Sequence, residues 1–296
     1  MRIFVTGASG WIGTAVVPEL HRAGHEVLGL ARSDAAATVV SGLGAEVLRG
    51  DLDDLDALGK GAGACEGVVH LGYNHDFARM DDAARTDRAA IETMGAALEG
   101  SGGPLLIASG VVGLTEGEAA TEADEPTVSS HPRTASAELA RSFASRGVRP
   151  VIVRFAPTVH GPGDHGFIAT LVAIARERGM SGYVDDGTNR WPAIHRLDAA
   201  VLTRLALDGA AAGSAVHATA EPGIAARDIA AAIGRGLDLP VGSVAAGDAT
   251  EHFGWLGRFF AADVPASSEV TQRVLGWTPT HPGLLDDLDA GHYFAT

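Results

Sequence analysis

The chain of 296 residues contains one cysteine, Cys65, one lysine, Lys60, and only three tyrosines. A single cysteine excludes an internal disulfide bond and fits a reducing compartment, so we expect a cytoplasmic protein. No run of about 18 apolar residues occurs, which argues against a membrane span, and the strand pattern that starts at Met1 argues against a signal peptide. Basic side chains are scarce too. The net charge of −15 disfavours nucleic acids and anionic membranes as partners.

Short apolar runs alternate with helical patterns through the first half of the chain. The runs predict strands at 3–5, 26–31, 45–48, 67–71, 105–108 and 150–155, and the intervening segments predict helices at 11–22, 34–41, 53–60, 77–99 and 133–146. Apolar runs without polar alternation are typical of strands that helices cover on both faces. The predicted fold class is therefore α/β, with a doubly wound parallel sheet.

The pattern changes after a cluster of glycine and proline at 157–166. Mixed helices and short strands follow it, which predicts a first domain over 1–156 and a smaller α/β substrate lobe over 157–296, with some later elements returning to the first domain. The polar, acidic segment 115–130 is predicted to be a surface loop, and covering a site is its alternative role.

Three glycines at a spacing of three, Gly7, Gly10 and Gly13, separate the first predicted strand from the first helix. A strand, a tight glycine turn and a helix N-terminus form an anion site, because free backbone N–H groups and the helix dipole both favour a pyrophosphate. Gly7 permits the turn, Gly10 lets the phosphate approach, and Gly13 lets helix and strand pack closely. The residues predicted to contact the nucleotide here are Thr6, Gly7, Ser9, Gly10, Trp11, Ile12 and Gly13.

The residues after the second predicted strand indicate which dinucleotide binds. An acidic side chain there holds a ribose 2′-hydroxyl, whereas an arginine suits a 2′-phosphate. The chain has Arg32 and Ser33 at this place, followed by Asp34, and a guanidinium with a hydroxyl favours NADP(H). The alternative is a solvated surface arginine. Asp51 and Leu52 are placed to contact the adenine. The alternative role of Asp51 is to cap the next helix, and Asp53 could equally serve as that cap.

Several segments together resemble motifs of one enzyme family. They are Thr6–Gly13 (TGASGWIG), Asp51-Leu52, His70–Gly72, Arg154–Gly163 with its VHGPG ending, Asp185–Asp198 and Leu275–Pro279 (LGWTP). The chain is in this way similar to the extended short-chain dehydrogenase/reductase family over nearly its whole length. The resemblance implies a Rossmann domain, a C-terminal substrate lobe and a nucleotide in the cleft between them. By their place after strand four, Leu71, Gly72 and Tyr73 are expected beside that nucleotide.

The chain departs from the family at the proton-transfer residues. Members of the family usually carry Tyr-x-x-x-Lys near the start of the helix before strand six. Here the corresponding stretch, 129–138, holds neither residue type, and Lys60 belongs to the helix after strand three. The chain therefore resembles the atypical members that keep the glycine motif without this pair.

Other side chains are candidates for proton transfer and substrate binding. His131 and Arg133 lie where the tyrosine would stand, and we expect an acid from the first and a carbonyl or ribose contact from the second. Their alternative role is a loop and helix start at Pro132. Ser109 and His75 follow strands five and four, at the carboxyl ends where such sheets bind ligands. Their alternatives are a Ser-Gly turn and a loop before a helix capped by Asp76.

The predicted helix 77–99 carries an apolar stripe in which Asp87 occupies one position. A buried carboxylate must be paired, and Arg85, Arg88 or a backbone donor are the expected partners. The stripe is also a candidate face for a homodimer through helices 77–99 and 133–146. Histidines at 160, 165 and 195 lack metal-ligand spacing, so no metal site is expected. Trp191 and most of the aromatics in 255–260 are expected in the core of the second lobe rather than in a pocket wall.

The prediction from these observations is an NADPH-dependent oxidoreductase. It would reduce a carbonyl or conjugated carbonyl of a small molecule, with His131 or His75 giving the proton and Ser109 holding the oxygen. Two alternatives stay open: an NADP(H)-binding regulatory or redox-sensing protein without turnover, and an epimerase, isomerase or lyase that uses the nucleotide transiently.

Overall fold

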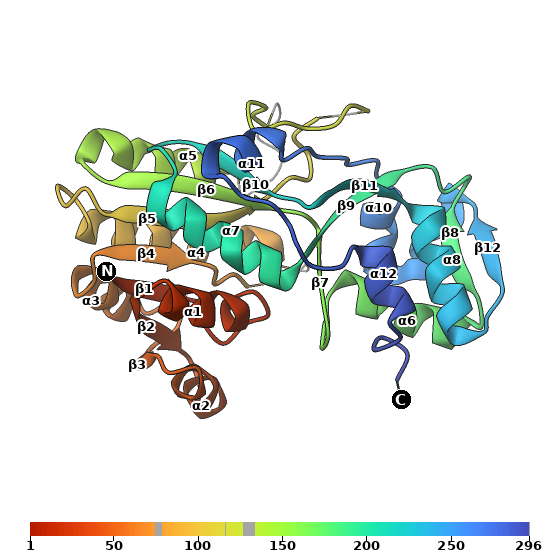
Figure 1. Cartoon of the computed structure of the whole chain (residues 1–296), viewed down its shortest axis with the longest axis horizontal. Coiled ribbons are helices and arrows are strands. Elements are labelled where there is room, and N and C mark those ends of the chain that lie inside the picture. The colour runs from red at the N-terminus through yellow and green to blue at the C-terminus, as the bar shows by residue number, and fades with distance from the viewer. Residues whose placement is uncertain (75–78, 116, 127–133, 296) are drawn as a thin grey trace.

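A seven-stranded parallel sheet forms the larger part of the molecule (Figure 1). The computed structural model describes residues 1–74, 79–115, 117–126 and 134–295. The strand order is β10-β6-β5-β4-β1-β2-β3, and every pairing is parallel. The strands are β1 (Arg2–Thr6), β2 (Glu26–Ala31), β3 (Glu46–Arg49), β4 (Gly67–His70), β5 (Pro104–Gly110), β6 (Arg149–Phe155) and β10 (Ala215–Ala218). The predicted fold class is confirmed.

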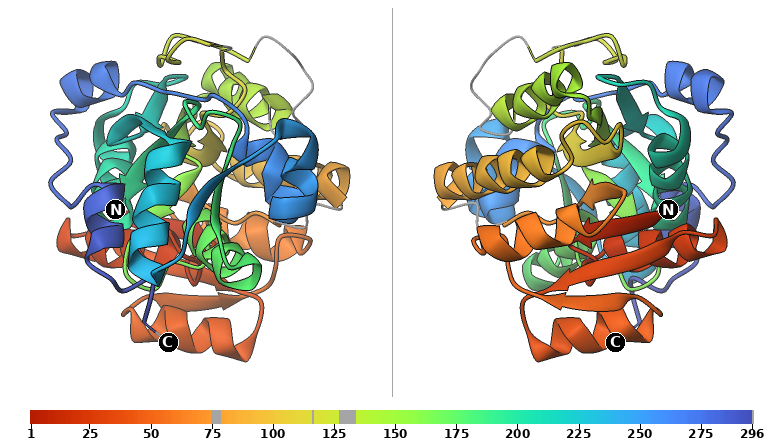
Figure 2. Two further views of the ribbon diagram at one scale, coloured as in Figure 1. Left: turned by 90° about the vertical axis from the view of Figure 1, so that its right-hand side faces the viewer. Right: turned by 90° about the vertical axis from the view of Figure 1, so that its left-hand side faces the viewer.

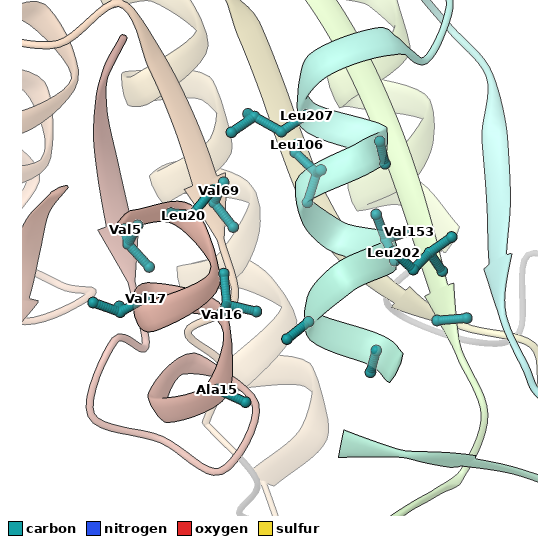
Figure 3. Packing of buried hydrophobic residues seen from close by; sticks show 14 of the residues in the cluster. Val5, Ala15, Val16, Val17, Leu20, Val69, Leu106, Val153, Leu202 and Leu207 are labelled. Carbon is teal, nitrogen blue, oxygen red and sulfur yellow. The ribbon is translucent and has the colours of Figure 1, made fainter. Parts of the chain in front are cut away.

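Helices cover both faces of this sheet. Those that pack on one face are α1 (Gly13–Arg22), α2 (Asp34–Gly42) and α7 (Arg196–Gly209), and those on the other are α3 (Leu55–Gly63), α4 (Met80–Ala97) and α5 (Thr134–Ser142), which a 3₁₀ turn extends as η2 (Phe143–Arg146). Figure 3 shows the first face, where Val16 and Leu20 of α1 meet Leu202 and Leu207 of α7 above Val5, Val69 and Val153 of the strands. This burial of aliphatic side chains is the main stabilising contribution to the domain.

The second lobe lies beyond the carboxyl ends of the strands, at the right of Figure 1. Its strands are β7 (Thr158–His160), β8 (Ser181–Val184), β9 (Arg190–His195), β11 (Glu221–Ala225) and β12 (Val241–Val244). Its helices are α6 (Phe167–Arg178), α8 (Ala226–Leu237), α9 (Ala249–Phe253), α10 (Gly257–Phe260) and α12 (Leu284–Asp289). They enclose a separate core around Trp191 and Phe260.

Later parts of the chain return to the sheet before the chain ends in the second lobe. β10 forms the outer edge next to β6, and α11 (Glu269–Leu275) lies beside it (Figure 1). Trp277 packs into the core under α7, and α12 then packs against α8 in the second lobe. The boundary predicted between residues 156 and 157 stays a prediction.

Several predicted boundaries need correction, and caps explain the clearest case. The helix expected at 53–60 begins at Leu55 because the Asp54 carboxylate accepts a hydrogen bond from the Ala57 N–H at 3.0 Å. The cap is therefore Asp54, neither Asp51 nor Asp53. The predicted cap at Asp76 lies outside the described residues. α4 is described from Met80, and its apolar stripe contacts the sheet and Phe143 rather than solvent. These stripe residues are therefore buried within one molecule, and the homodimer stays a prediction.

The acidic segment 115–130 is tied down where it is described. Ala120 is buried and pairs with Ala266 in a parallel bridge. The Glu125 carboxylate accepts a bidentate pair of hydrogen bonds from Arg141, at 2.6 and 2.7 Å. Arg154, which is buried, donates to the Asp124 carbonyl at 2.7 Å. Residues 117–126 therefore form a strap between the sheet and the chain near residue 266, not a free surface loop.

Histidines cluster where the two lobes join. His160 on β7 is fully buried and contacts the Asp287 carboxylate at 2.8 Å. The His195 ring lies edge-on to His160 and stacks on His281 at 4.8 Å. Burial, with the neighbouring rings of His160 and His281, lowers the pKa of His195 to about 4. The His195 ring therefore stays neutral in the folded protein at physiological pH.

This low pKa predicts a loss of stability in mild acid. Below about pH 6.5 the unfolded chain binds a proton at residue 195 that the folded protein does not bind until about pH 4, so the free energy of unfolding falls as pH falls through this window. We expect a contribution of at most about 3 kcal/mol from this residue, reduced by solvent screening. Denaturant unfolding at several pH values measures it. His195→Asn keeps a capping acceptor for α7 and removes the titration, so an unchanged pH slope in this variant would contradict the assignment.

Among the residues that the structure describes, no helix is long and apolar enough to cross a membrane.

Candidate active site

The site is the edge formed by the carboxyl ends of β1 and β4, where the strand order reverses. Open α/β sheets bind their ligands in the crevice at such a point. Gly7 follows β1 with φ +67°, and a Cβ there would lie 2.7 Å from the Gly72 N after β4. A Cβ on Gly13 would lie 2.1 Å from the Gly7 carbonyl oxygen. The two glycines therefore fix the turn and the approach of α1 to it.

The N-terminus of α1 has free hydrogen-bond donors. α1 has no side-chain cap and no acidic residue in its first turn, whereas Ser33 caps α2 and Asp54 caps α3. Within the described part of the chain, nothing accepts from the N–H groups of Trp11 and Ile12. Gly10 is exposed, and a Cβ there would meet only the Gly7 carbonyl oxygen within 4 Å. An uncapped helix start with open space above it fits a pyrophosphate.

The ends of β2 and β3 present basic side chains. Arg32 is exposed, and none of the described residues pairs with its guanidinium. Arg49, which sequence analysis missed, donates to the Ser33 carbonyl at 2.5 Å and to the Asp34 carboxylate at 2.7 Å. Because β3 pairs with β2 in a register that sets Arg49 opposite Ala31, the backbone of Arg49 lies at the same end of the sheet as that of Arg32, which follows Ala31 in the chain. The expected pairing of β2 with β3 in the parallel sheet is the sequence signal that could have identified Arg49.

The other predicted nucleotide contacts surround the same edge. Asp51 is exposed, and one of its carboxylate oxygens accepts from the N–H groups of Asp53 and Asp54, both at 3.0 Å. A Cβ on Gly72 would lie 3.1 Å from Leu52, so these two residues are neighbours. Leu71 and Tyr73 are half-buried next to Gly72. Their roles toward a nucleotide stay predictions.

Only one of the four catalytic candidates lies within the described residues. Ser109 is half-buried near the carboxyl end of β5, where it pairs with Arg154 of β6. His75, His131 and Arg133 lie outside the described residues. The structure therefore places Ser109 near the carboxyl end of β5, and both its contact with a substrate and the source of the proton stay predictions.

A buried chain of polar groups runs behind this edge. Thr6 Oγ1 lies 2.6 Å from His70 Nδ1, His70 Nε2 lies 3.2 Å from Asp87 Oδ1, and Ser136 donates to Asp87 Oδ2 at 2.5 Å. Each of the four side chains is at most 3% exposed. The Thr6 hydroxyl also accepts from the Gly72 N–H at 3.1 Å. The chain thus joins β1, β4, α4 and the first turn of α5.

Asp87 is buried as predicted, but its expected pairing with Arg85 needs correction. The Asp87 carboxylate contacts His70 and Ser136, whereas Arg85 pairs with the exposed Asp82. The helical period revealed the burial of Asp87, but these partners come from a strand and a helix distant in sequence. A buried carboxylate held by hydrogen bonds gives this part of the site a fixed geometry.

The aromatic residues of the second lobe form a cluster whose members range from buried to exposed. Trp191 and Phe260 are buried as expected, whereas Trp255, at 46% exposed, is one of the aromatics that does not join the core. Phe167, at the start of α6, contacts both Trp191 and Trp255, with ring centroids 5.5 and 5.6 Å apart. Figure 2 shows α9 and α10 on the same side of the molecule as α4. The cluster therefore supplies an apolar surface on the second lobe.

No group of three or more His, Cys, Asp or Glu side chains in the described parts of the chain could hold a metal ion. Cys65 is half-buried, and burial raises the pKa of its thiol to about 11, which keeps it protonated.

A doubly wound sheet whose first helix begins uncapped behind a glycine turn defines a class of α/β proteins that bind dinucleotides at this edge. The model of the NAD dependent epimerase/dehydratase family matches residues 3–218. The chain belongs to this family.

Known proteins resemble the chain to different degrees. A protein of Schizosaccharomyces pombe, described as uncharacterized, is 46% identical over 295 residues, covering 99% of this chain and 100% of that protein. The 2-alkyl-3-oxoalkanoate reductase of Stenotrophomonas maltophilia is 28% identical over 73% of this chain and 68% of the reductase. The solved dTDP-glucose 4,6-dehydratase of Streptomyces venezuelae, with NAD bound, has a TM-score of 0.78 at 22% identity, covering 99% of this chain and 96% of the dehydratase. The last similarity shows the fold.

Proposed function

We propose that the protein is an NADPH-dependent reductase of a carbonyl or conjugated carbonyl in a small organic molecule. The observation that carries the proposal is the pair Arg32 and Arg49 at the ends of β2 and β3, with the Asp34 carboxylate already engaged by Arg49. Two guanidinium groups at this place favour a 2′-phosphate over a free ribose hydroxyl. The dinucleotide that carries this phosphate is the one that cells use for reduction.

The described residues have separable roles in this reaction. NADPH, when bound, supplies the hydride. The N–H groups of Trp11 and Ile12 bind the pyrophosphate, and Arg32 binds the 2′-phosphate. Ser109 Oγ donates a hydrogen bond to the substrate oxygen and orients the carbonyl. The hydrogen-bonded side chains of Thr6, His70, Asp87 and Ser136 hold the start of α5 against β1 and β4. The segment with His131 and Arg133 precedes α5 in the sequence, and we expect the proton to come from it.

The relatives support two reactions. The Stenotrophomonas maltophilia protein is named a reductase of a keto compound, which favours carbonyl reduction. The name of the family itself favours an epimerase or dehydratase that oxidises and reduces its substrate in turn, and this is the second candidate. An NADP(H)-binding protein without turnover is the third, because the chain lacks the Tyr-x-x-x-Lys pair.

One experiment separates these candidates. The purified protein is titrated with NADPH by calorimetry and then mixed with NADPH and a panel of ketones, aldehydes and enones while the absorbance of the reduced nicotinamide is followed. Net loss of absorbance supports the reductase. A sugar nucleotide that transiently reduces added NADP⁺, without net formation of NADPH, supports the epimerase or dehydratase. Tight binding without turnover supports the binding protein, and no binding of NADPH contradicts the proposal.

Ser109→Ala tests the position of the substrate. For a carbonyl that the panel identifies as substrate, we expect kcat/KM to fall about tenfold, because one hydrogen bond to the reacting oxygen is lost. The affinity for NADPH should stay unchanged. Ser142→Ala is the matched control, since Ser142 is exposed at the far end of α5 and donates to the Leu139 carbonyl. Equal kinetics for Ser109→Ala and the control would exclude Ser109 from the site.

We also propose a cytoplasmic location, because the chain has one half-buried cysteine and no disulfide bond. A homodimer through α4 and α5 remains our proposal as well. Because the apolar stripe of α4 faces its own sheet, such a dimer would use the outer residues of these helices.

A further inference from the structure

The indole of Trp11 connects the pyrophosphate turn to the second lobe. Its Nε1 donates to the Val159 carbonyl on β7 at 2.7 Å. The His165 ring meets it edge-on at 5.6 Å between centroids, and the Arg196 guanidinium lies over it with Cζ 4.1 Å from the centroid. All three partners come from residues after 156. The backbone of Trp11 is part of the turn that would bind the pyrophosphate. Trp11 therefore contributes its backbone to the pyrophosphate turn and its side chain to the contact with the second lobe.

Arg196 strengthens this connection from the start of α7. Its Nη2 donates to Thr14 Oγ1 on α1 at 3.2 Å, so the guanidinium contacts two residues at the beginning of α1. Burial lowers the pKa of Arg196, and its Nε has no partner among the described residues. A partly desolvated guanidinium over a tryptophan is the stronger form of a cation–π contact.

The loop that follows β7 is fixed on its other side by the C-terminal segment. The Tyr293 hydroxyl donates to Asp164 Oδ2 at 2.8 Å, and the Gly166 N–H donates to Asp164 Oδ1 at 2.7 Å. Residues 161–166 therefore lie between Trp11 on one side and Tyr293 on the other. The loop ends at Phe167, the first residue of α6, whose ring contacts the exposed Trp255. A shift of Trp11 would thus be transmitted directly to the aromatic surface of the second lobe.

We propose that Trp11 and Arg196 are positioning residues that couple nucleotide binding to the order of the segment 159–167, which comprises the end of β7, the loop 161–166 and the first residue of α6. The inference rests on the proposed binding of NADPH. A pyrophosphate bound by the backbone N–H of Trp11 reduces the motion of this residue. Because the indole contacts Val159 and His165, the motion of these two residues is reduced as well. Coupling of this kind is reciprocal, so a substrate that orders the loop strengthens nucleotide binding by the same factor.

Hydrogen–deuterium exchange tests the coupling with NADPH as the only ligand. In the wild-type protein, we expect saturating NADPH to slow exchange in peptides covering 159–167 by about tenfold or more. Trp11→Phe removes the indole donor, and Arg196→Met removes the guanidinium at similar length. Both variants should lose most of the slowing, and by the reciprocity of the coupling NADPH binding should weaken by up to the same factor of about ten but no further, because the backbone donors of the turn remain. Two independent variants keep the test valid if one fails to fold.

The matched control is Arg146→Met. Arg146 also lies 4.1 Å from an aromatic centroid, that of Phe143, but in η2 beyond the far end of α5. This variant should keep the full effect of NADPH on 159–167. If the wild-type protein binds no NADPH, the proposed function fails. If it binds NADPH and exchange in 159–167 does not slow, or slows equally in all variants, the coupling is wrong while the function stands. A loss of NADPH affinity above about tenfold in both variants would make the two side chains part of the nucleotide contact and would also overturn the inference.

Discussion

Gly10→Val should weaken NADPH binding by about 100-fold or more and leave the fold intact. Gly10 is exposed, and a Cβ would meet the Gly7 carbonyl oxygen at 3.1 Å, a tight contact that a small shift of the turn relieves, and no other atom within 4 Å. The valine methyl groups would stand above the N–H groups of Trp11 and Ile12. Losing two charge-assisted hydrogen bonds costs about 3 kcal/mol, which is about 100-fold in affinity. Calorimetric titration measures the affinity, and thermal unfolding measures the stability.

Two other glycines make this test specific. A Cβ on Gly13 would lie 2.1 Å from the Gly7 carbonyl oxygen, so Gly13→Val should destabilise the fold as well as remove binding. A Cβ on Gly42, at the end of α2, would meet no atom of the described protein within 4 Å, so Gly42→Val should change NADPH binding little. Unchanged affinity in Gly10→Val would show that the turn does not bind a pyrophosphate, whatever the fold.

The first domain could be predicted from the sequence because local patterns determine it. Apolar runs of strand length alternate with segments of helical periodicity. Gly7 and Gly13 determine the glycine turn, because the first permits its backbone conformation and the second the close approach of α1. Helix starts were less accurate, because several carboxylates compete to cap one helix. Asp51, Asp53 and Asp54 are all candidates in the sequence, and only the folded backbone brings Asp54 to the Ala57 N–H.

The polar contacts behind the site could not be predicted, because they join segments that are distant in the sequence. The helical period placed Asp87 on a buried face, but His70 comes from a strand and Ser136 from another helix, 49 residues away. The second lobe shows the same limit. Trp255 is exposed and Trp191 is buried, and the rings of both contact Phe167 from a third segment, so their burial depends on contacts between parts of the chain that are distant in the sequence.

Arg32→Ala should weaken NADPH binding by about 100-fold and NADH binding by no more than about threefold. A charge-assisted hydrogen bond to a phosphate contributes about 1.5 to 3 kcal/mol, and NADH has no phosphate at this position. Arg227, an exposed arginine at the start of α8, serves as the control. Its replacement by alanine should change neither affinity. Equal weakening of both dinucleotides by Arg32→Ala would remove the argument for NADPH.

Arg49→Ala should act on the same selectivity through Asp34. The Arg49 guanidinium lies 2.7 Å from the Asp34 carboxylate and also holds the Ser33 carbonyl. Without Arg49 the carboxylate is left uncompensated beside the expected phosphate, and repulsion between like charges should weaken NADPH binding about tenfold. The double variant Arg49→Ala with Asp34→Asn should recover most of that loss, because the repelling charge is gone. If the second substitution restores nothing, Arg49 contacts the phosphate directly, and its bond to Asp34 in the free protein is the contact that NADPH displaces.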